Sequence, residues 1–175
     1  MSDASRKFWK HPAVLTVLLF VGLLAIGLVT RAPAWMFPQY YALHGVLAAP
    51  FCSALALWHL RRGGSVYELI AATALLALVL GMMSPAMGLG FAAVAVVTLV
   101  VWAALGRCTE KTRCFATAVV FGASDYPCAV VVGVALGTYG PSVESLLVIV
   151  VLLILSIALA VFAASLVSGR GETWA

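Results

Sequence analysis

The strongest candidate for a functional residue in this sequence is an aspartate inside an apolar stretch. Asp125 lies near the middle of Thr112–Gly137, a stretch long and apolar enough to cross a bilayer. An ionised aspartate at the centre of a transmembrane helix costs about 2.5–3.5 kcal/mol on insertion scales. We therefore expect Asp125 to face protein, water or a ligand, and not lipid.

The residues that follow Asp125 strengthen this expectation. Pro127 has no backbone N–H, so the carbonyl of Ala123 is left without its helical partner. A carboxylate beside a free carbonyl favours a ligand with hydrogen-bond donors, such as an amine or a hydroxylated ring. The alternative is that Asp125 bonds Ser, Thr or Tyr side chains of neighbouring helices and only holds the bundle together.

The composition defines the class of protein to which this stretch belongs. Of the 175 residues, 65% are hydrophobic and 9% are charged, and the mean hydropathy is +1.15. Soluble domains are about 25% charged, so the chain is interpreted as an all-α integral membrane protein. The basic residues lie between apolar runs, where they report topology. The net charge of +4 therefore does not indicate a nucleic-acid partner.

Six apolar runs predict six transmembrane helices in a single membrane domain that covers residues 1–175. The first run follows basic residues and resembles a signal peptide, but it is long enough to span a bilayer. If the N-terminus is cytoplasmic, all but one of the 10 Lys and Arg residues face the cytoplasm, the exception being Arg31. We therefore expect a multi-pass plasma-membrane protein with both termini in the cytoplasm. The helices are expected at about 13–30, 42–60, 66–83, 87–105, 112–137 and 143–168.

Helix ends and helix contacts are also readable from local patterns. Ser65 and Glu68 form the spacing of a capping box, and Thr109 is a candidate N-cap. Small residues recur every four positions in two helices, which favours close helix contact. These two stripes are Gly45, Ala49 and Ser53 in one helix, and Ser156, Ala160, Ala164 and Ser168 in the other.

Residues suited to a binding pocket gather on the side opposite the basic loops. The segment Arg31–Tyr41 is expected to be an outer loop rich in aromatic rings, close to the first turn of the second helix. Such rings commonly settle at the membrane interface, and a buried histidine is commonly satisfied by a neighbour, so both bland alternatives stay open. The candidate substrate-binding residues are Asp125, Tyr126, Trp35, Gln39, Tyr40, Tyr41, His44 and Met83.

Signatures of catalysis are weak in this sequence. Gly122-Ala123-Ser124 loosely resembles an intramembrane serine protease, but the helix at 143–168 contains no histidine to act as a base. There is no pair of carboxylates and no spacing of Cys and His that is typical of a metal site. We expect a protein that is not an enzyme and that uses no cofactor and no metal.

Three short stretches carry a resemblance to a known family. They are Pro50-Phe51, Leu60-Arg61-Arg62-Gly63-Gly64 and Gly81-Met82-Met83-Ser84-Pro85. With six short helices and no ATPase motif, the chain resembles the substrate-binding S subunits of energy-coupling factor (ECF) transporters. Members of that family often carry an alanine-x-x-x-alanine motif in the first helix, whereas Ala13 is followed here by Val17.

The resemblance implies uptake of a small nutrient, a vitamin or a precursor, from the outside. It implies a transmembrane coupling subunit and two ATPase subunits as partners within the lipid bilayer. Asp125 and Tyr126 would anchor polar groups of the substrate, and His44 and Gln39 would donate or accept hydrogen bonds. The rings that would stack on the substrate or cover it are Trp35, Tyr40 and Tyr41.

Two other classes of function compete with this reading. An accessory or structural membrane protein would use its small-residue stripes to contact a partner and would have no ligand. A channel or secondary transporter would carry polar residues along several helices through their full depth, a pattern that this sequence lacks.

Overall fold

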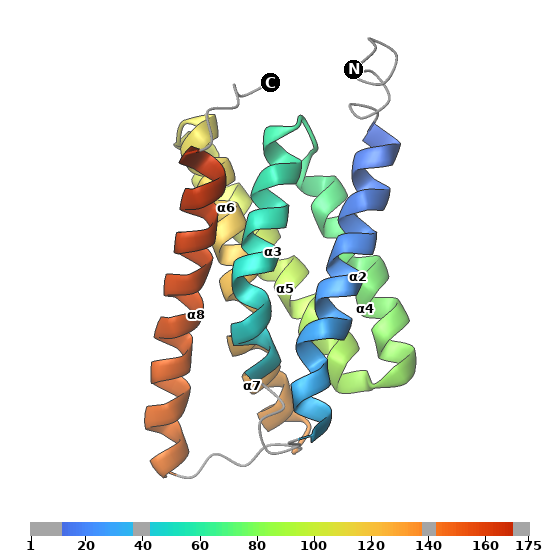
Figure 1. Cartoon of the computed structure of the whole chain (residues 1–175), viewed down its shortest axis with the longest axis vertical. Helices are drawn as coiled ribbons and strands as arrows, with labels where there is room; N and C mark the ends of the chain where they lie inside the picture. Colours follow the sequence, from blue (N-terminus) through green and yellow to red (C-terminus); the bar gives the residue numbers. More distant parts are fainter. Residues whose placement is uncertain (1–11, 37–42, 138–142, 170–175) are drawn as a thin grey trace.

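The computed structural model describes residues 12–36, 43–137 and 143–169, and within them the side chains of 13–30, 43–137 and 146–169. The described chain is all-helical (Figure 1). A short 3₁₀ turn, η2 (Leu105–Arg107), follows the fourth long helix. The α-helices are α2 (Pro12–Met36), α3 (Leu43–Arg61), α4 (Val66–Met83), α5 (Pro85–Ala104), α6 (Glu110–Ala123), α7 (Asp125–Ala135) and α8 (Val143–Gly169).

These helices are those of a multi-pass membrane protein. Among the described residues, five helices are long and apolar enough to cross a membrane, and the pair α6 and α7 makes up to six if it counts as one span. The single helix expected at 112–137 is wrong in this respect, because α6 and α7 meet at Ser124 with a bend of 42°. Pro127 explains the break, since its ring cannot continue the helical hydrogen bonding.

Two predicted loops are shorter than expected. The expectation of a loop over Arg31–Tyr41 is wrong for residues 31–36, because α2 continues to Met36. Alanine and methionine are good helix formers, so the residues that follow Arg31 can continue α2. The connection between the helices expected at 66–83 and 87–105 is reduced to Ser84, which ends α4 and also precedes Pro85 at the start of α5. Proline is well suited to a first helical position.

The predicted caps are confirmed. Ser65 accepts from the backbone N–H of Glu68, and the Glu68 carboxylate accepts from the N–H of Ser65, which completes the capping box. Thr109 accepts from the N–H of Thr112 at the start of α6. Both caps satisfy backbone groups that the first turn of a helix leaves without partners.

The centre of the bundle is α3, which packs against α2, α6, α7 and α8. Its small-residue stripe is confirmed as a close contact, because a Cβ added at Gly122 of α6 would lie 2.4 Å from the carbonyl oxygen of Ala49. The hydroxyl of Ser53 donates to the carbonyl oxygen of Ala160 in α8 at 3.0 Å. In the second stripe, Ser156, Ala160 and Ala164 are fully buried, whereas Ser168 is exposed.

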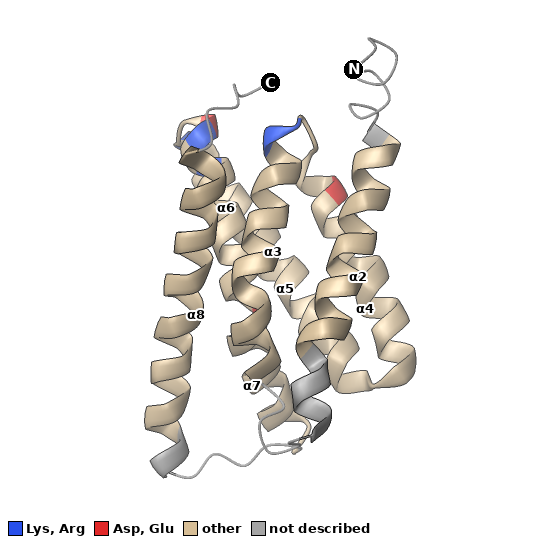
Figure 2. Cartoon of the chain, in the orientation of Figure 1, with Lys and Arg blue, Asp and Glu red and all other residues tan. Residues whose placement is uncertain are grey.

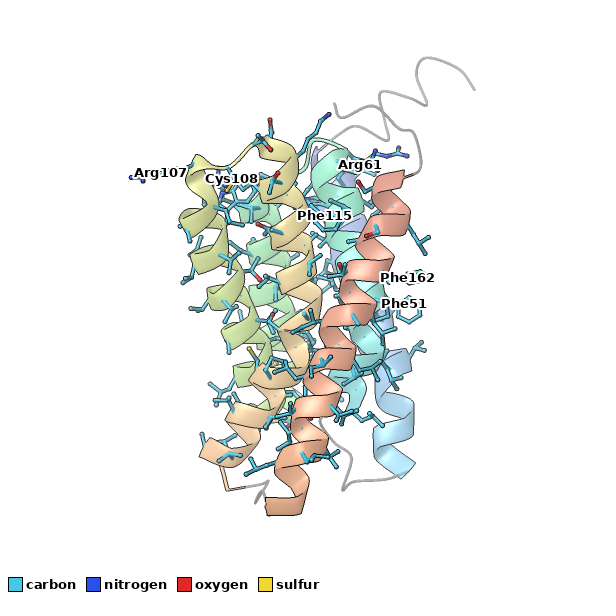
Figure 3. The ribbon with its side chains drawn as sticks, turned by 90° about the vertical axis from the view of Figure 1, so that its left-hand side faces the viewer. Phe51, Arg61, Arg107, Cys108, Phe115 and Phe162 are labelled. Atoms are coloured by element: carbon cyan, nitrogen blue, oxygen red, sulfur yellow. The ribbon has the colours of Figure 1, made fainter. Side chains whose placement is uncertain are left out.

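The outward faces of the helices are apolar, as a lipid environment requires. Phe51 on α3 and Phe162 on α8 point away from the bundle (Figure 3), and each is about 60% exposed, at 59% and 62%. A soluble monomer rarely exposes a large contiguous apolar surface. An apolar outer surface of this kind suits the candidate membrane spans.

Most of the described charged side chains lie at one end of the bundle (Figure 2). The start of α2 and the end of α8 lie at that same end (Figure 1). Arg61 is buried there and donates to the carbonyl oxygen of Val167, in the last turn of α8. Arg113 donates to the carbonyl oxygen of Trp102 at 3.0 Å and lies 3.6 Å from its ring centroid. We call this end the charged end.

Candidate functional site

Among the acids whose side chains the structure describes, Asp125 is buried, whereas Glu68 is half-buried and Glu110 is exposed. Asp125 is the first residue of α7 and only 6% exposed. A helix N-terminus favours a negative charge, because its backbone N–H groups carry partial positive charge. The break at Ser124 therefore provides a polar environment for a carboxylate within an otherwise apolar crossing.

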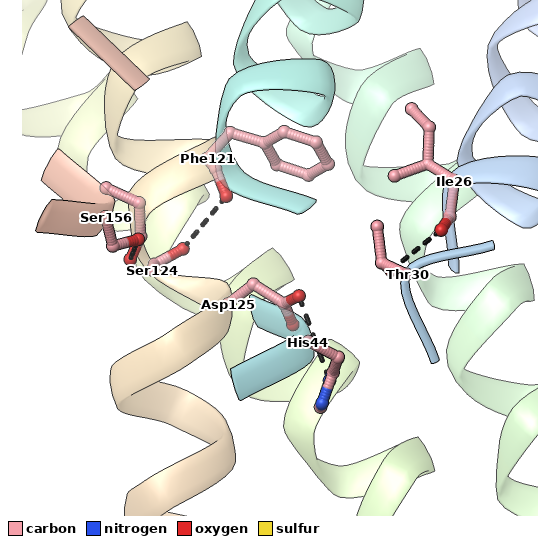
Figure 4. Close-up of polar contacts among 8 residues, drawn as sticks. Ile26, Thr30, His44, Phe121, Ser124, Asp125 and Ser156 are labelled. Atoms are coloured by element: carbon pink, nitrogen blue, oxygen red, sulfur yellow. Dashed lines mark hydrogen bonds and ion pairs between the residues drawn. The ribbon is translucent and has the colours of Figure 1, made fainter. Parts of the chain in front are cut away.

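Hydrogen bonds from serine hydroxyls stabilise the broken helix beside Asp125 (Figure 4). Ser124 donates to the carbonyl oxygen of Phe121 at 3.2 Å. Ser156 of α8 donates to the carbonyl oxygen of Ala123 at 3.4 Å, which is the carbonyl that Pro127 deprives of its helical partner. The free acceptor expected beside the carboxylate is thus occupied by a side chain of the same chain.

His44, in the first turn of α3, faces Asp125 (Figure 4). Its Nε2 lies 4.0 Å from Oδ2 of Asp125, and the imidazole is 4% exposed. That separation is too long for a direct hydrogen bond, although it is short enough for electrostatic interaction. The two groups form a buried polar pair, which we call the His44–Asp125 pair.

A glycine next to His44 allows α3 and α7 to come into close contact. A Cβ added at Gly45 would lie 2.6 Å from the backbone nitrogen of Tyr126 and 2.7 Å from its Cα. Only a residue without a side chain permits this approach of α3 to the start of α7. The contact buries Tyr126 to 2% exposure and sets His44 opposite Asp125.

The pair borders a small cavity between α3, α5 and α7. The cavity volume is about 10 Å³, which is the space of about one water molecule. A carboxylate and an imidazole that share such a cavity can both accept hydrogen bonds from one donor placed between them. The cavity is lined by His44, Ala86, Met87, Gly90, Phe91, Asp125 and Ala129.

The structure unites only part of the predicted site. Asp125 and His44 meet, and Tyr126 is buried beside them. Met83 does not line the cavity and is 71% exposed at the end of α4, because its side chain points out of the α4–α5 hairpin. Trp35 belongs to α2, but its side chain lies outside the described residues. Gln39, Tyr40 and Tyr41 also lie outside the described residues.

Sequence reasoning missed the wall that α5 contributes. Met87 and Phe91 are spaced four residues apart, so they lie on one face of α5, and Gly90 lies between them. The sequence signal that could have indicated this wall was the group Met87, Gly90 and Phe91 near the start of α5. Met87, and not Met83, is the methionine at the cavity.

A second buried histidine lies at the charged end and has a structural role. His59 is fully buried, and its Nε2 lies 3.2 Å from Oε2 of Glu68, without hydrogen-bond geometry. The same oxygen accepts from the N–H of Ser65 in the capping box. The ring fills the space that a side chain at Gly64 would need, since a Cβ there would lie 2.3 Å from Nε2. These contacts fix the turn between α3 and α4.

No metal centre is evident in the described part of the chain, where no group of three or more His, Cys, Asp or Glu side chains could hold an ion. Cys52, Cys114 and Cys128 are buried and Cys108 is exposed, all without disulfides. No family model, curated protein or solved structure matches this chain. The case for a function therefore depends on the His44–Asp125 pair and its surroundings.

Proposed function

We propose that this protein is a membrane-embedded binding subunit for the uptake of a small nutrient from the outside, as the resemblance to ECF S subunits implies. The observation that carries the proposal is the buried His44–Asp125 pair on a cavity at a broken membrane-crossing helix. Transporters commonly bind substrates where a transmembrane helix is discontinuous. An acid within a membrane span is also a functional-site hypothesis by default.

The distribution of charge supports an orientation for this subunit. The charged end carries the Lys and Arg side chains that the structure describes, so the positive-inside rule directs it to the cytoplasm. The His44–Asp125 pair would then be reached from the opposite, outer side of the plasma membrane. A transmembrane coupling subunit and two ATPases would supply the energy for release of the nutrient to the inside.

Binding of a whole nutrient requires that the site widen. A cavity of about 10 Å³ admits a group of the size of water, whereas pockets for small molecules measure roughly 300–1,000 Å³. The nutrient would therefore insert one polar group between His44 and Asp125 while the rest of the molecule separates the surrounding helices.

A thermal-unfolding screen of the purified full chain against water-soluble vitamins and their precursors tests this proposal. A nutrient at 100 times its dissociation constant would stabilise the folded protein by about 2.7 kcal/mol. Asp125→Asn should abolish the shift. Glu110→Gln removes the same charge from the exposed first turn of α6 and should retain it. A screen without any stabilising compound, or an unchanged shift in Asp125→Asn, would refute the proposal.

The small volume of the cavity favours a second candidate, an accessory membrane protein without a ligand. Under that reading the small-residue stripes were expected to contact a partner, but their described members are mostly buried inside the bundle. The partner would then contact other surfaces of the chain. Co-purification from membranes separates the two candidates, because only the uptake subunit should bring ATPase subunits with it.

A further inference from the structure

We propose that the cavity beside the His44–Asp125 pair is a binding site for a primary ammonium group. The inference rests on the proposed function and deepens it, because it names the substrate class: a small solute that carries an –NH₃⁺ group. Three properties of the site lead to this assignment, namely its size, its buried carboxylate and the composition of its wall.

Size restricts the group that can enter. The cavity volume of about 10 Å³ corresponds to one water molecule. An –NH₃⁺ group has nearly the dimensions of water, whereas a quaternary ammonium or a guanidinium group is several times larger. The cavity therefore fits the smallest organic cation head group, whereas the larger ones would require it to widen around the head group itself.

Charge favours a cation over a neutral donor. The Asp125 carboxylate is buried, and among the described side chains its ion-pair partner is His44, at 4.0 Å. The described Lys and Arg side chains are gathered at the charged end (Figure 2). A third group placed between the two side chains would close this gap, since an –NH₃⁺ group has three N–H donors. One of these N–H groups would donate to the Asp125 carboxylate.

The residues that line the cavity also favour a cation over a neutral group. Phe91 lines it, and the face of an aromatic ring attracts cations. The remaining lining is largely apolar, with Met87, Gly90 and Ala129. In such surroundings a charge–charge interaction is stronger than in water. A neutral hydroxyl of the same size would not gain the full attraction to Asp125.

Methylammonium chloride is the probe that tests this inference on the purified full chain. The midpoint of thermal unfolding should rise with methylammonium concentration. Tetramethylammonium chloride and sodium chloride at the same ionic strength, and methanol at the same molarity, should leave the midpoint unchanged. An equal shift with any of these three compounds, or no shift with methylammonium, would overturn the assignment.

Two variants with matched controls locate the site. Asp125→Asn should abolish the methylammonium shift, and Glu110→Gln should keep it. Gly90→Ala tests the site with the carboxylate intact, because Gly90 lines the cavity and an added Cβ would meet no atom within 4 Å. We expect this methyl group to reduce the apparent affinity at least tenfold. Gly106→Ala, which also meets no atom within 4 Å and lies in exposed η2, should have no effect.

The outcomes also separate this inference from the proposed function. Stabilisation by a vitamin that carries no ammonium group, without any response to methylammonium, would overturn the inference and leave nutrient uptake intact. A response to methylammonium that Gly90→Ala and Asp125→Asn both leave unchanged would place binding elsewhere and overturn the inference as well.

Discussion

Substitution of Gly45 by alanine tests the helix contact on which the site depends. The new Cβ would lie 2.6 Å from the backbone nitrogen of Tyr126, whereas ordinary contacts begin at 3.4 Å. Backbone atoms cannot rotate away as side chains can, so α3 and α7 must separate by most of an ångström. Overpacking of this kind costs about 1–3 kcal/mol. Alanine is a better helix former than glycine by about 1 kcal/mol, which offsets part of this loss.

A matched variant isolates the packing effect. Gly27→Ala lies inside α2, where an added Cβ would meet no atom within 4 Å, so it gains the helix propensity without the clash. In an unfolding titration with SDS, followed by circular dichroism, Gly45→Ala should be less stable than Gly27→Ala by about 1–3 kcal/mol. Equal stability of the two variants would show that α3 and α7 do not approach each other as described.

Two further substitutions test contacts elsewhere in the bundle by the same SDS titration. Ser53→Ala removes the buried hydrogen bond to α8 and should cost about 0.6 kcal/mol, whereas Ser165→Ala, at an exposed serine that bonds within its own helix, should change little. A loss that is the same in both would contradict an interhelical role for Ser53. Ser65→Ala removes the capping box and should cost about 1 kcal/mol. Ser84→Ala is its control, because Ser84 makes no side-chain cap bond to α5, and a similar loss there would argue against the cap.

Much of the fold could be predicted because its determinants are local. Long apolar runs set the helices, and the capping box at Ser65 and the cap at Thr109 depend on residues within three or four positions. The stripe that contains Gly45 and Ser53 was predictable for a related reason, since helical periodicity alone places small residues on one face. The identity of the facing helices was not predictable in this way, because it depends on contacts between distant segments.

The predicted helix bounds that were wrong lie beside prolines, because a proline can end, bend or interrupt a helix. The segment Arg31–Tyr41, which contains Pro33, was expected to be a loop, but α2 continues to Met36. The stretch around Pro127 was expected to be one continuous helix with a free carbonyl at Ala123. Instead, α6 and α7 are separate helices, and the Ser156 hydroxyl donates to that carbonyl. Whether a proline ends, bends or interrupts a helix depends on the neighbours that can satisfy the released carbonyl. That information comes from tertiary structure.

The candidate site was predictable only in part for the same reason. An acid in an apolar stretch identifies Asp125 without any structure, and His44 follows from its place at a helix start. The contribution of Met87 and Phe91 depends on how α5 lies against α7, which no spacing in the sequence specifies.

The turn at Ser84 determines which parts of the bundle are free to move. A single residue joins α4 to α5, and Gly81 and Gly88 bring the two backbones together, since a Cβ added at Gly88 would lie 2.7 Å from Cα of Gly81. The two helices therefore form a rigid hairpin that carries Met87 and Phe91 as a fixed wall. Access to Asp125 then requires a hinge in the opposite wall, and the bend at Ser124 between α6 and α7 is where the backbone is already interrupted.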